Sequence, residues 1–231
     1  MQRQPILLSV GGSLVVPKGG LDVIFLQKLN IFIRQQVEKG YTFFLVIGGG
    51  GTTRHYQRAA REVIGADVSP DDIDWLGIHV TRLNAHLIRT IFKDIAHPRI
   101  IENYAHKLEG WHEPVVIGAG WKPGWSTDYC AVTLAKDYGI QTMINVTNID
   151  WVYDKDPKQH PDAQILKSLQ WDDLLKIVGT EWVPGANVPF DPVASALAKE
   201  LKLKVIIANG TNFDNLENIL QNREFIGTVI Q

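Results

Sequence analysis

The sequence has few of the features that mark secreted, membrane-bound or nucleic-acid-binding proteins. It contains one cysteine in 231 residues, so no internal disulfide can form, which is typical of a reducing compartment. No apolar run reaches membrane-spanning length, and no N-terminal stretch has the form of a signal peptide. The formal net charge of -2 gives no general attraction to nucleic acid. We therefore expect a cytoplasmic protein that binds neither membrane nor nucleic acid.

Motifs for metal binding and nucleophilic catalysis are also missing. The seven histidines show no zinc-type spacing such as His-Glu-x-x-His, so we expect no metal site built from protein side chains alone. The single cysteine, Cys130, lies among Ala131, Val132 and Leu134, which favours a buried, unreactive thiol.

Four consecutive glycines, residues 48–51, are the most informative feature of the chain. They follow an apolar and aromatic segment, residues 43–47, that is typical of a buried strand. A helical pattern comes next, with apolar residues at Tyr56, Ala59, Ala60, Val63 and Ile64. Glycines at such a turn let backbone N–H groups approach an anion, and the helix start adds partial positive charge. With Arg54 as a charged fork, the segment predicts a phosphate cradle; the alternative is a glycine turn needed only for tight packing.

A second turn of the same kind lies near the N-terminus. A short apolar strand, residues 6–10, leads into Gly11-Gly12-Ser13, and a helical pattern follows over residues 21–38. The apolar positions of that pattern include Ile24, Leu29, Ile31, Ile33 and Val37. Strand, helix and strand, with glycines after both strands, predict a βαβ unit whose strand ends collect a ligand at one edge of a parallel sheet.

The remaining sequence continues the alternation of helices and strands. Helices are expected at 76–92, 128–137, 191–201 and 213–220, strands at 114–117, 141–146 and 204–208, and polar loops at 121–128 and 153–162. A loop as long as the second one is usually functional in a compact α/β domain. We expect one domain over residues 1–231, because this length can bury one substantial core.

In order and spacing, the motifs resemble those of the amino-acid-kinase superfamily, most closely archaeal-type uridylate kinases. The matching pieces are Gly11-Gly12-Ser13, Gly48-Gly49-Gly50 with Arg54, Asp74-Trp75-Leu76-Gly77-Ile78, Thr81-Arg82-Leu83-Asn84-Ala85, Pro123-Gly124 with Thr127-Asp128, Thr147-Asn148-Ile149-Asp150, Val152-Tyr153, Asp156-Pro157 and Asp191-Pro192. One glycine motif alone would be weak evidence, whereas the ordered series covers nearly the whole chain.

The resemblance implies a three-layer α/β/α fold with a mostly parallel central sheet, and phosphoryl transfer from ATP to UMP in pyrimidine nucleotide metabolism. Mg²⁺ would bridge the donor phosphates. The residues that would bind ATP are Gly12, Ser13, Gly50, Arg54, Thr147, Asn148, Tyr153 and Asp156. The residues that would hold the acceptor are Gly49, Asp74, Trp121, Lys122, Pro123, Gly124, Trp125, Ser126 and Thr127. Residues 1–140 would form the acceptor part and 141–231 the ATP part, and relatives of this type commonly assemble as hexamers.

The chain departs from the family pattern where positive charge is expected. Ser9 and Gly51 stand where many relatives have lysines that would neutralise phosphoryl charge. Lys122 is the best replacement candidate, and we assign it a catalytic role together with Arg54. Trp121, Trp125 and Trp151 stand where relatives have smaller residues. These indoles either shape the acceptor pocket or serve loop packing or an oligomer contact.

Some site residues have structural alternatives, and the activity has rivals. Asp74 either contacts a ribose or caps a helix, Tyr153 could be core packing, and Asp156 could belong to an ordinary turn. Asp191 reads as a helix N-cap. The missing lysines favour a weakened, ATP-binding storage or regulatory relative, similar to molybdenum-storage proteins. A kinase for another small acceptor is the third alternative.

Overall fold

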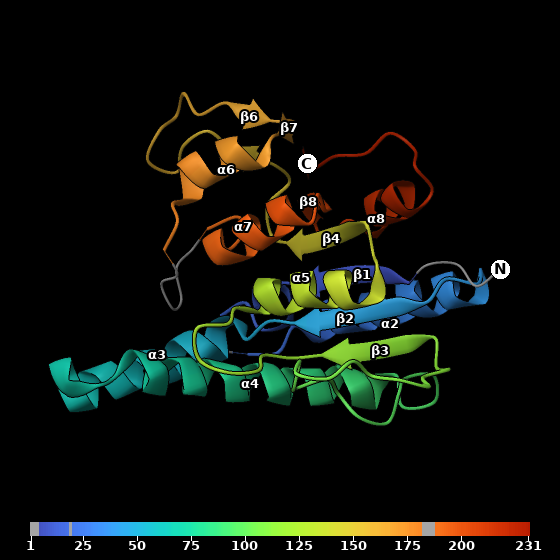
Figure 1. Cartoon of the computed structure of the whole chain (residues 1–231), viewed down its shortest axis with the longest axis horizontal. Coiled ribbons are helices and arrows are strands. Elements are labelled where there is room, and N and C mark those ends of the chain that lie inside the picture. Colours follow the sequence, from blue (N-terminus) through green and yellow to red (C-terminus); the bar gives the residue numbers. More distant parts are fainter. Residues whose placement is uncertain (1–4, 19, 182–187) are drawn as a thin grey trace.

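The structure, a computed structural model that describes residues 5–18, 20–181 and 188–231, is built on a mostly parallel sheet between helical layers (Figure 1). The strands of this sheet are β1 (Ile6–Val10), β2 (Phe43–Ile47), β3 (Val115–Gly118), β4 (Thr142–Thr147), β7 (Ser168–Leu169), β8 (Lys204–Asn209) and β9 (Thr228–Ile230). Within the described residues the sheet has seven strands in the order β3-β2-β1-β4-β8-β9-β7. Its first five strands pair in parallel, whereas β9 is antiparallel to β8.

Helices cover both faces of the sheet. They are α1 (Gly12–Val15), α2 (Val23–Glu38), α3 (Gly50–Ile64), α4 (Pro70–Ile91), α5 (Thr127–Tyr138), α6 (Trp171–Val178), α7 (Pro192–Glu200) and α8 (Phe213–Leu220), with a 3-10 turn at Gly65–Asp67. The buried residues of α2, α4 and α8 join one core cluster, and those of α5, α6 and α7 join the other. The expected three-layer fold is confirmed. Among the described helices, none is long and apolar enough to cross a membrane.

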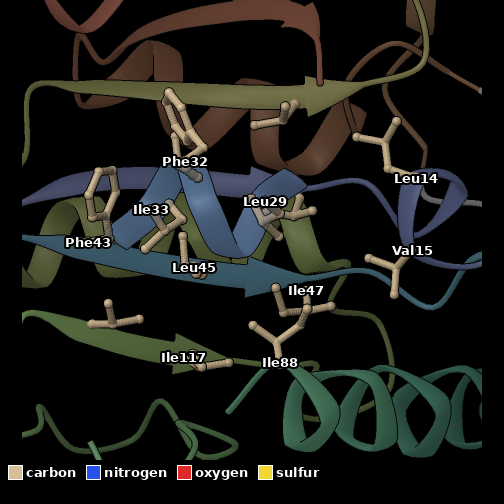
Figure 2. Packing of buried hydrophobic residues seen from close by; sticks show 14 of the residues in the cluster. Leu14, Val15, Leu29, Phe32, Ile33, Phe43, Leu45, Ile47, Ile88 and Ile117 are labelled. Carbon is tan, nitrogen blue, oxygen red and sulfur yellow. The ribbon is translucent and has the colours of Figure 1, made fainter. Parts of the chain in front are cut away.

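Successive side chains of β2 point to opposite faces of the sheet, so this strand contributes to both core clusters. Phe43, Leu45 and Ile47 pack in the cluster with α2 and α4 (Figure 2). Phe44 and Val46 pack in the cluster with α5. Every residue of β2 is buried, because the strand lies inside the sheet and helices cover both of its faces. This rigid strand carries the four glycines at its carboxyl end.

Two helices differ from the sequence expectation. In α2 the buried side chains include Phe25, Leu29 and Phe32, while Ile24 and Ile31, which the apolar pattern had included, are 67% and 56% exposed. The buried face of α2 runs through Phe25, Leu29, Phe32 and Ile33, and Ile24 and Ile31 lie outside it. Helix α4 begins at Pro70 and not at residue 76, because Ser69 caps it by accepting a hydrogen bond from the Asp72 N–H.

Elements that the sequence did not predict lie at the margins. Strands β5 (Val152–Tyr153) and β6 (Ile165–Leu166) form an antiparallel pair within the expected loop at 153–162 and its flanks. Helix α6 and strands β7 and β9 were also missed. At the opposite margin, bridges from Ala96 to Val115 and from Ile101 to Gly118 lay a loop segment along β3.

Candidate functional site

A cavity of about 250 Å³ opens where the carboxyl ends of β1, β2 and β3 meet α3, α4 and α5. Of the predicted site residues, those that line it are Gly12, Gly49, Gly50, Arg54, Asp74, Trp125, Ser126 and Thr127. Residues from both predicted glycine turns and from the predicted acceptor loop therefore share one cavity. This is the strand edge at which open parallel sheets bind ligands.

The two glycine turns interlock at the floor of the cavity. The Gly48 N–H donates to the Val10 carbonyl (2.9 Å), and the Gly51 N–H donates to the Val16 carbonyl (2.7 Å). A Cβ on Gly12 would collide with the backbone nitrogen of Gly50, and Gly50 itself has φ +68°. Tight packing therefore requires these glycines, and the same packing leaves a surface of bare backbone toward the cavity. The two interpretations of the glycines are compatible.

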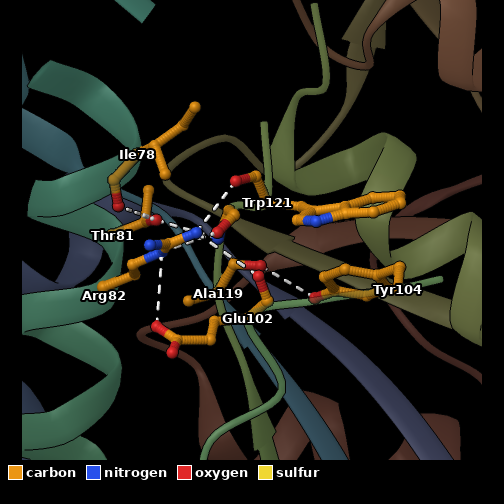
Figure 3. Close-up of polar contacts among 8 residues, drawn as sticks. Ile78, Thr81, Arg82, Glu102, Tyr104, Ala119 and Trp121 are labelled. Carbon is orange, nitrogen blue, oxygen red and sulfur yellow. Dashed lines mark hydrogen bonds and ion pairs between the residues drawn. The ribbon is translucent and has the colours of Figure 1, made fainter. Parts of the chain in front are cut away.

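Helix α4 fixes the loops on either side of the cavity. Asn84 Nδ2 donates to the carbonyls of Gly48 (2.9 Å) and Gly49 (3.2 Å), which holds the glycine turn from below. Thr81 Oγ1 accepts a hydrogen bond from the Gly120 N–H (2.9 Å). Arg82 donates to the carbonyls of Gly120 and Trp121 (Figure 3). The Thr-Arg-x-Asn-Ala segment of α4 thus positions the backbone of the glycine turn after β2 and of the loop after β3.

Asp74, a predicted acceptor residue, lines the cavity from α4. It lies within α4 and not at its N-cap, so its alternative role as a cap is excluded. Its Oδ2 accepts a hydrogen bond from the Gly124 N–H (2.7 Å), which ties the 121–127 loop to α4.

Aromatic side chains give the acceptor loop its shape. Trp121 and Trp125 pack edge to face with ring centroids 4.7 Å apart, and Trp125 packs in the same way on Tyr129 at 4.4 Å. The Lys122 ammonium lies 4.4 Å from the Trp121 ring centroid and 5.2 Å from that of Trp125. Trp125 lines the cavity, whereas Lys122 does not and is held over the indoles by cation–π attraction.

Two carboxylates that the sequence analysis left out of the site also line the cavity. Asp128, at the start of α5, accepts a hydrogen bond from Ser9 Oγ (3.0 Å), and the Asp191 N–H approaches its other oxygen at 3.4 Å. Burial, and then the charge of Asp191, raise the pKa of Asp128 to about 6. Asp191 caps α7 as predicted, by accepting from the Ala194 N–H (2.6 Å), and burial raises its pKa as well. Its Oδ2 is buried without a hydrogen-bond partner.

The cavity wall does not include the remaining predicted residues. These are Ser13, Trp121, Lys122, Pro123, Gly124, Thr147, Asn148, Tyr153 and Asp156. Ser13 follows Gly12 in α1, and Thr147 ends β4, the strand next to β1. The carboxylate of Asp156 accepts from the Lys158 N–H (2.9 Å) and from Gln159 Nε2 (3.0 Å), as in an ordinary turn. Cys130 is fully buried, and burial raises its pKa to about 12, which keeps it a thiol as expected.

Comparison with known proteins gives consistent matches over most of the chain. The amino acid kinase family model matches residues 4–209. Uridylate kinase of Sulfurisphaera tokodaii is 34% identical over 86% of this chain and 88% of its own length. Uridylate kinase of Methanocorpusculum labreanum is 33% identical over 97% and 94%. The crystal structure of uridylate kinase from Archaeoglobus fulgidus superposes with a TM-score of 0.79 at 28% identity and covers 98% of this chain and 100% of that one.

Proposed function

Because the chain belongs to the amino acid kinase family, we propose that it transfers the γ-phosphoryl group of ATP to UMP, a nucleoside monophosphate, and so forms UDP. The observation that carries this proposal is the shared cavity. It brings the interlocked glycine turns, Arg54, Asp74 and Trp125 to one place at the strand ends. Relatives and a solved structure named as uridylate kinases match over nearly the full length.

The roles of the residues follow from their positions. Gly12 and Gly50 line the cavity with Arg54, and together with Ser13, which follows Gly12 in α1, they would offer backbone to the donor phosphates. Asp74 and the 121–127 loop would hold the acceptor nucleoside. Thr147, Asn148, Tyr153 and Asp156 would hold the adenosine of ATP beyond the end of β4, within the proposed ATP part at 141–231. Each of these contacts is a proposal that substitutions can test.

The charge of the cavity supports a requirement for Mg²⁺. In the described residues its wall holds one cation, Arg54, and three carboxyl groups, Asp74, Asp128 and Asp191. Carboxylate and phosphate oxygens are the ligands that Mg²⁺ prefers, and the unpartnered Asp191 Oδ2 fits that chemistry. No described cluster of three His, Cys, Asp or Glu side chains could hold a metal by itself. Bound with ATP, the ion would neutralise phosphate charge.

The chain itself would contribute positioning and exclusion of water. A monophosphate acceptor is already anionic near neutral pH, so the reaction needs no side chain to act as nucleophile. Holding the two phosphates in line is the main task, and it falls to the backbone that Asn84 and Arg82 fix. Arg54 would bind the charge that develops on the transferred group. Lys122 could add a second cation only by leaving the indoles.

A coupled assay of ADP release tests the proposal. Purified protein with Mg-ATP is given UMP, CMP, dUMP, GMP or AMP, and Arg54→Ala is compared with Arg61→Ala. Arg61 is an exposed cation on the same helix that lies outside the cavity. We expect turnover with UMP, a loss of about a hundredfold or more in Arg54→Ala, and little change in the control. Turnover with a different acceptor would replace UMP in the proposal.

A second function is favoured by the scarcity of positive charge. Arg54 is the one cation on the described cavity wall, and Lys122 lies on the tryptophans. An ATP-binding storage or regulatory protein would tolerate this loss of catalytic charge. Tight ATP binding without turnover on any acceptor would support that function and contradict the kinase proposal.

We also propose that the chain forms a homo-oligomer, a hexamer by family resemblance, in the cytoplasm. Tyr56 and Val63, one face of α3 by their spacing, are 58% and 85% exposed. Leu83 of α4 is 65% exposed. Helices α3 and α4 pack against each other, and exposed apolar side chains on their outer surfaces are available to an interface between subunits. Light scattering coupled to size exclusion would give the mass, and Val63→Glu should lower it.

A further inference from the structure

Trp125 is the one aromatic side chain on the cavity wall, within the described part of the chain. The rest of that wall consists of glycines, polar side chains and two aliphatic side chains, Ile78 and Val188. The indole is only partly buried, although it packs on two other aromatic rings. Packing of the loop accounts for the buried part of this side chain, whereas the part that lines the cavity is available to a ligand.

The neighbouring rings hold the indole in place. Tyr104, Trp121, Trp125 and Tyr129 form a group that we call the aromatic cluster. Trp125 packs edge to face on Trp121 and on Tyr129, and Tyr104 lies 6.1 Å from Trp121 and 6.4 Å from Trp125 between ring centroids (Figure 3). The hydroxyl of the buried Tyr104 donates to the Ala119 carbonyl (2.8 Å), which ties the cluster to the end of β3. Because the indole is already ordered, a ligand that packs on it loses little affinity to immobilising it.

The groups of the cavity follow the order of the parts of a nucleoside monophosphate. Gly49 and Arg54 lie at the glycine turn, where phosphate is expected, and Asp74 is the predicted ribose contact. Trp125 follows Gly124, whose N–H donates to Asp74 Oδ2 (2.7 Å). The indole is thus one residue along the chain from the group that is tied to Asp74. In a nucleotide the base comes directly after the ribose, so the next surface that it meets is the aromatic one.

We propose that Trp125 is the stacking platform for the base of the acceptor nucleotide. The inference rests on the proposed function, since it concerns the acceptor of that reaction. Every base has a π-face, and stacking on an aromatic side chain strengthens binding whatever groups the edge of the base carries. The cavity, of about 250 Å³, is smaller than the roughly 300–1,000 Å³ of pockets for drug-sized ligands, which favours a single-ring base over a purine. Trp125 therefore recognises the ring, and other contacts distinguish uracil from cytosine.

Calorimetry separates a base contact from packing of the loop. UMP and ribose 5-phosphate, which has the same sugar and phosphate without a base, are titrated into the wild type and Trp125→Leu. We expect Trp125→Leu to weaken UMP binding about tenfold, the scale of one base stacked on an aromatic ring, and to leave ribose 5-phosphate binding unchanged. Equal losses for both ligands, or no loss for UMP, would mean that the indole only packs the loop and would overturn the inference.

Two further variants serve as controls. Trp125→Phe keeps a flat ring and should recover most of the UMP affinity that Trp125→Leu loses. Trp111→Leu removes an indole that packs on Phe44, with ring centroids 5.1 Å apart, and that lies outside the cavity wall, so it should bind both ligands as the wild type does. In Trp125→Leu, CMP should lose as much affinity as UMP, because stacking contacts the face of the ring and not its edge. A loss confined to UMP would contradict stacking.

The ADP-release assay distinguishes failure of this inference from failure of the proposed function. In Trp125→Leu the KM for UMP should rise about tenfold with a smaller change in kcat, because the contact is made before phosphoryl transfer. Unchanged kinetics would contradict the inference and leave the kinase proposal standing. Trp125-dependent binding of UMP without turnover would support the base contact and contradict the kinase proposal. If no nucleoside monophosphate binds, both are overturned.

Discussion

Replacing Asp128 by asparagine is expected to change how the stability of the fold depends on pH. Burial and the neighbouring Asp191 raise the pKa of Asp128 from 3.8 to about 6 in the folded protein. Between these values the folded state binds a proton that the unfolded state has lost, so stability falls as the pH rises through this window. The native carboxylate is thus unfavourable at neutral pH, and its removal should stabilise the fold there.

The pKa shift sets the size of the effect. About two units correspond to about 3 kcal/mol at most. Because Asp128 lies in the wall of the cavity, water screens part of this, and we expect about 1–2 kcal/mol. Asparagine can still accept the hydrogen bond from Ser9, but it loses the contact with the Asp191 N–H. The lost contact lowers the free energy of unfolding of the variant by an amount that does not vary with pH.

Urea unfolding at a series of pH values from about 4 to about 8 measures the difference in free energy of unfolding between Asp128→Asn and the wild type. The free energy of unfolding of Asp128→Asn should increase relative to that of the wild type as the pH rises through this range. Asp94→Asn is the control of opposite sign, because a hydrogen bond from Arg34 lowers the pKa of Asp94 to about 2. That variant should be less stable than the wild type throughout this pH range, because the stability that the Asp94 carboxylate contributes is lost only as the pH falls from 3.8 to about 2. A difference for Asp128→Asn that is constant with pH would refute the reasoning.

The remaining predictions concern the loops of the site. Gly50→Ala should destabilise the fold by more than Gly65→Ala in thermal unfolding, because both glycines have positive φ but only Gly50 faces the backbone of Gly12; equal losses would show that the close approach is unimportant. Asn84→Ala should cost about 1–3 kcal/mol in urea unfolding and lower kcat/KM, since the buried carbonyl of Gly48 and the partly buried carbonyl of Gly49 lose a donor; an unchanged kcat/KM would remove its positioning role. Lys122→Ala should lower kcat more than it changes KM in the ADP-release assay; unchanged rates would leave Lys122 as a loop charge.

The sequence predicted the central fold because its signals there are local. Apolar strands of five or six residues are marked at their ends by glycine, and helices α5 and α7 are marked at their starts by the N-caps Ser126 and Asp191. Such residues show in the sequence itself where an element begins or ends. The family resemblance then implied the three-layer arrangement with a mostly parallel central sheet. The marginal elements escaped prediction because β7 and β9 have two or three residues each, too few for a periodic pattern.

The site was predicted in part for the same reason. The glycines and Arg54 predict a phosphate site from their residue types alone. In the structure they line one cavity together with Asp74. Asp191 was identified as a cap, but its second role at the cavity depends on α7 lying beside α5, which no local pattern reveals. Asp128 stood within a family motif and could have been chosen from it. Its raised pKa arises only from burial next to Asp191.

The margins of the sheet bear on how copies of this chain can associate. At one margin, residues near Ala96 and Ile101 bridge to β3 and occupy part of its outer backbone. At the other margin, β7 offers only two residues, Ser168 and Leu169. Short or covered edges are poor templates for strand addition, so the sheet resists extension from one molecule into the next. Contacts through helices are therefore favoured over strand addition, and a destabilised variant should show little tendency to form intermolecular β-sheet while the margins of its sheet stay intact.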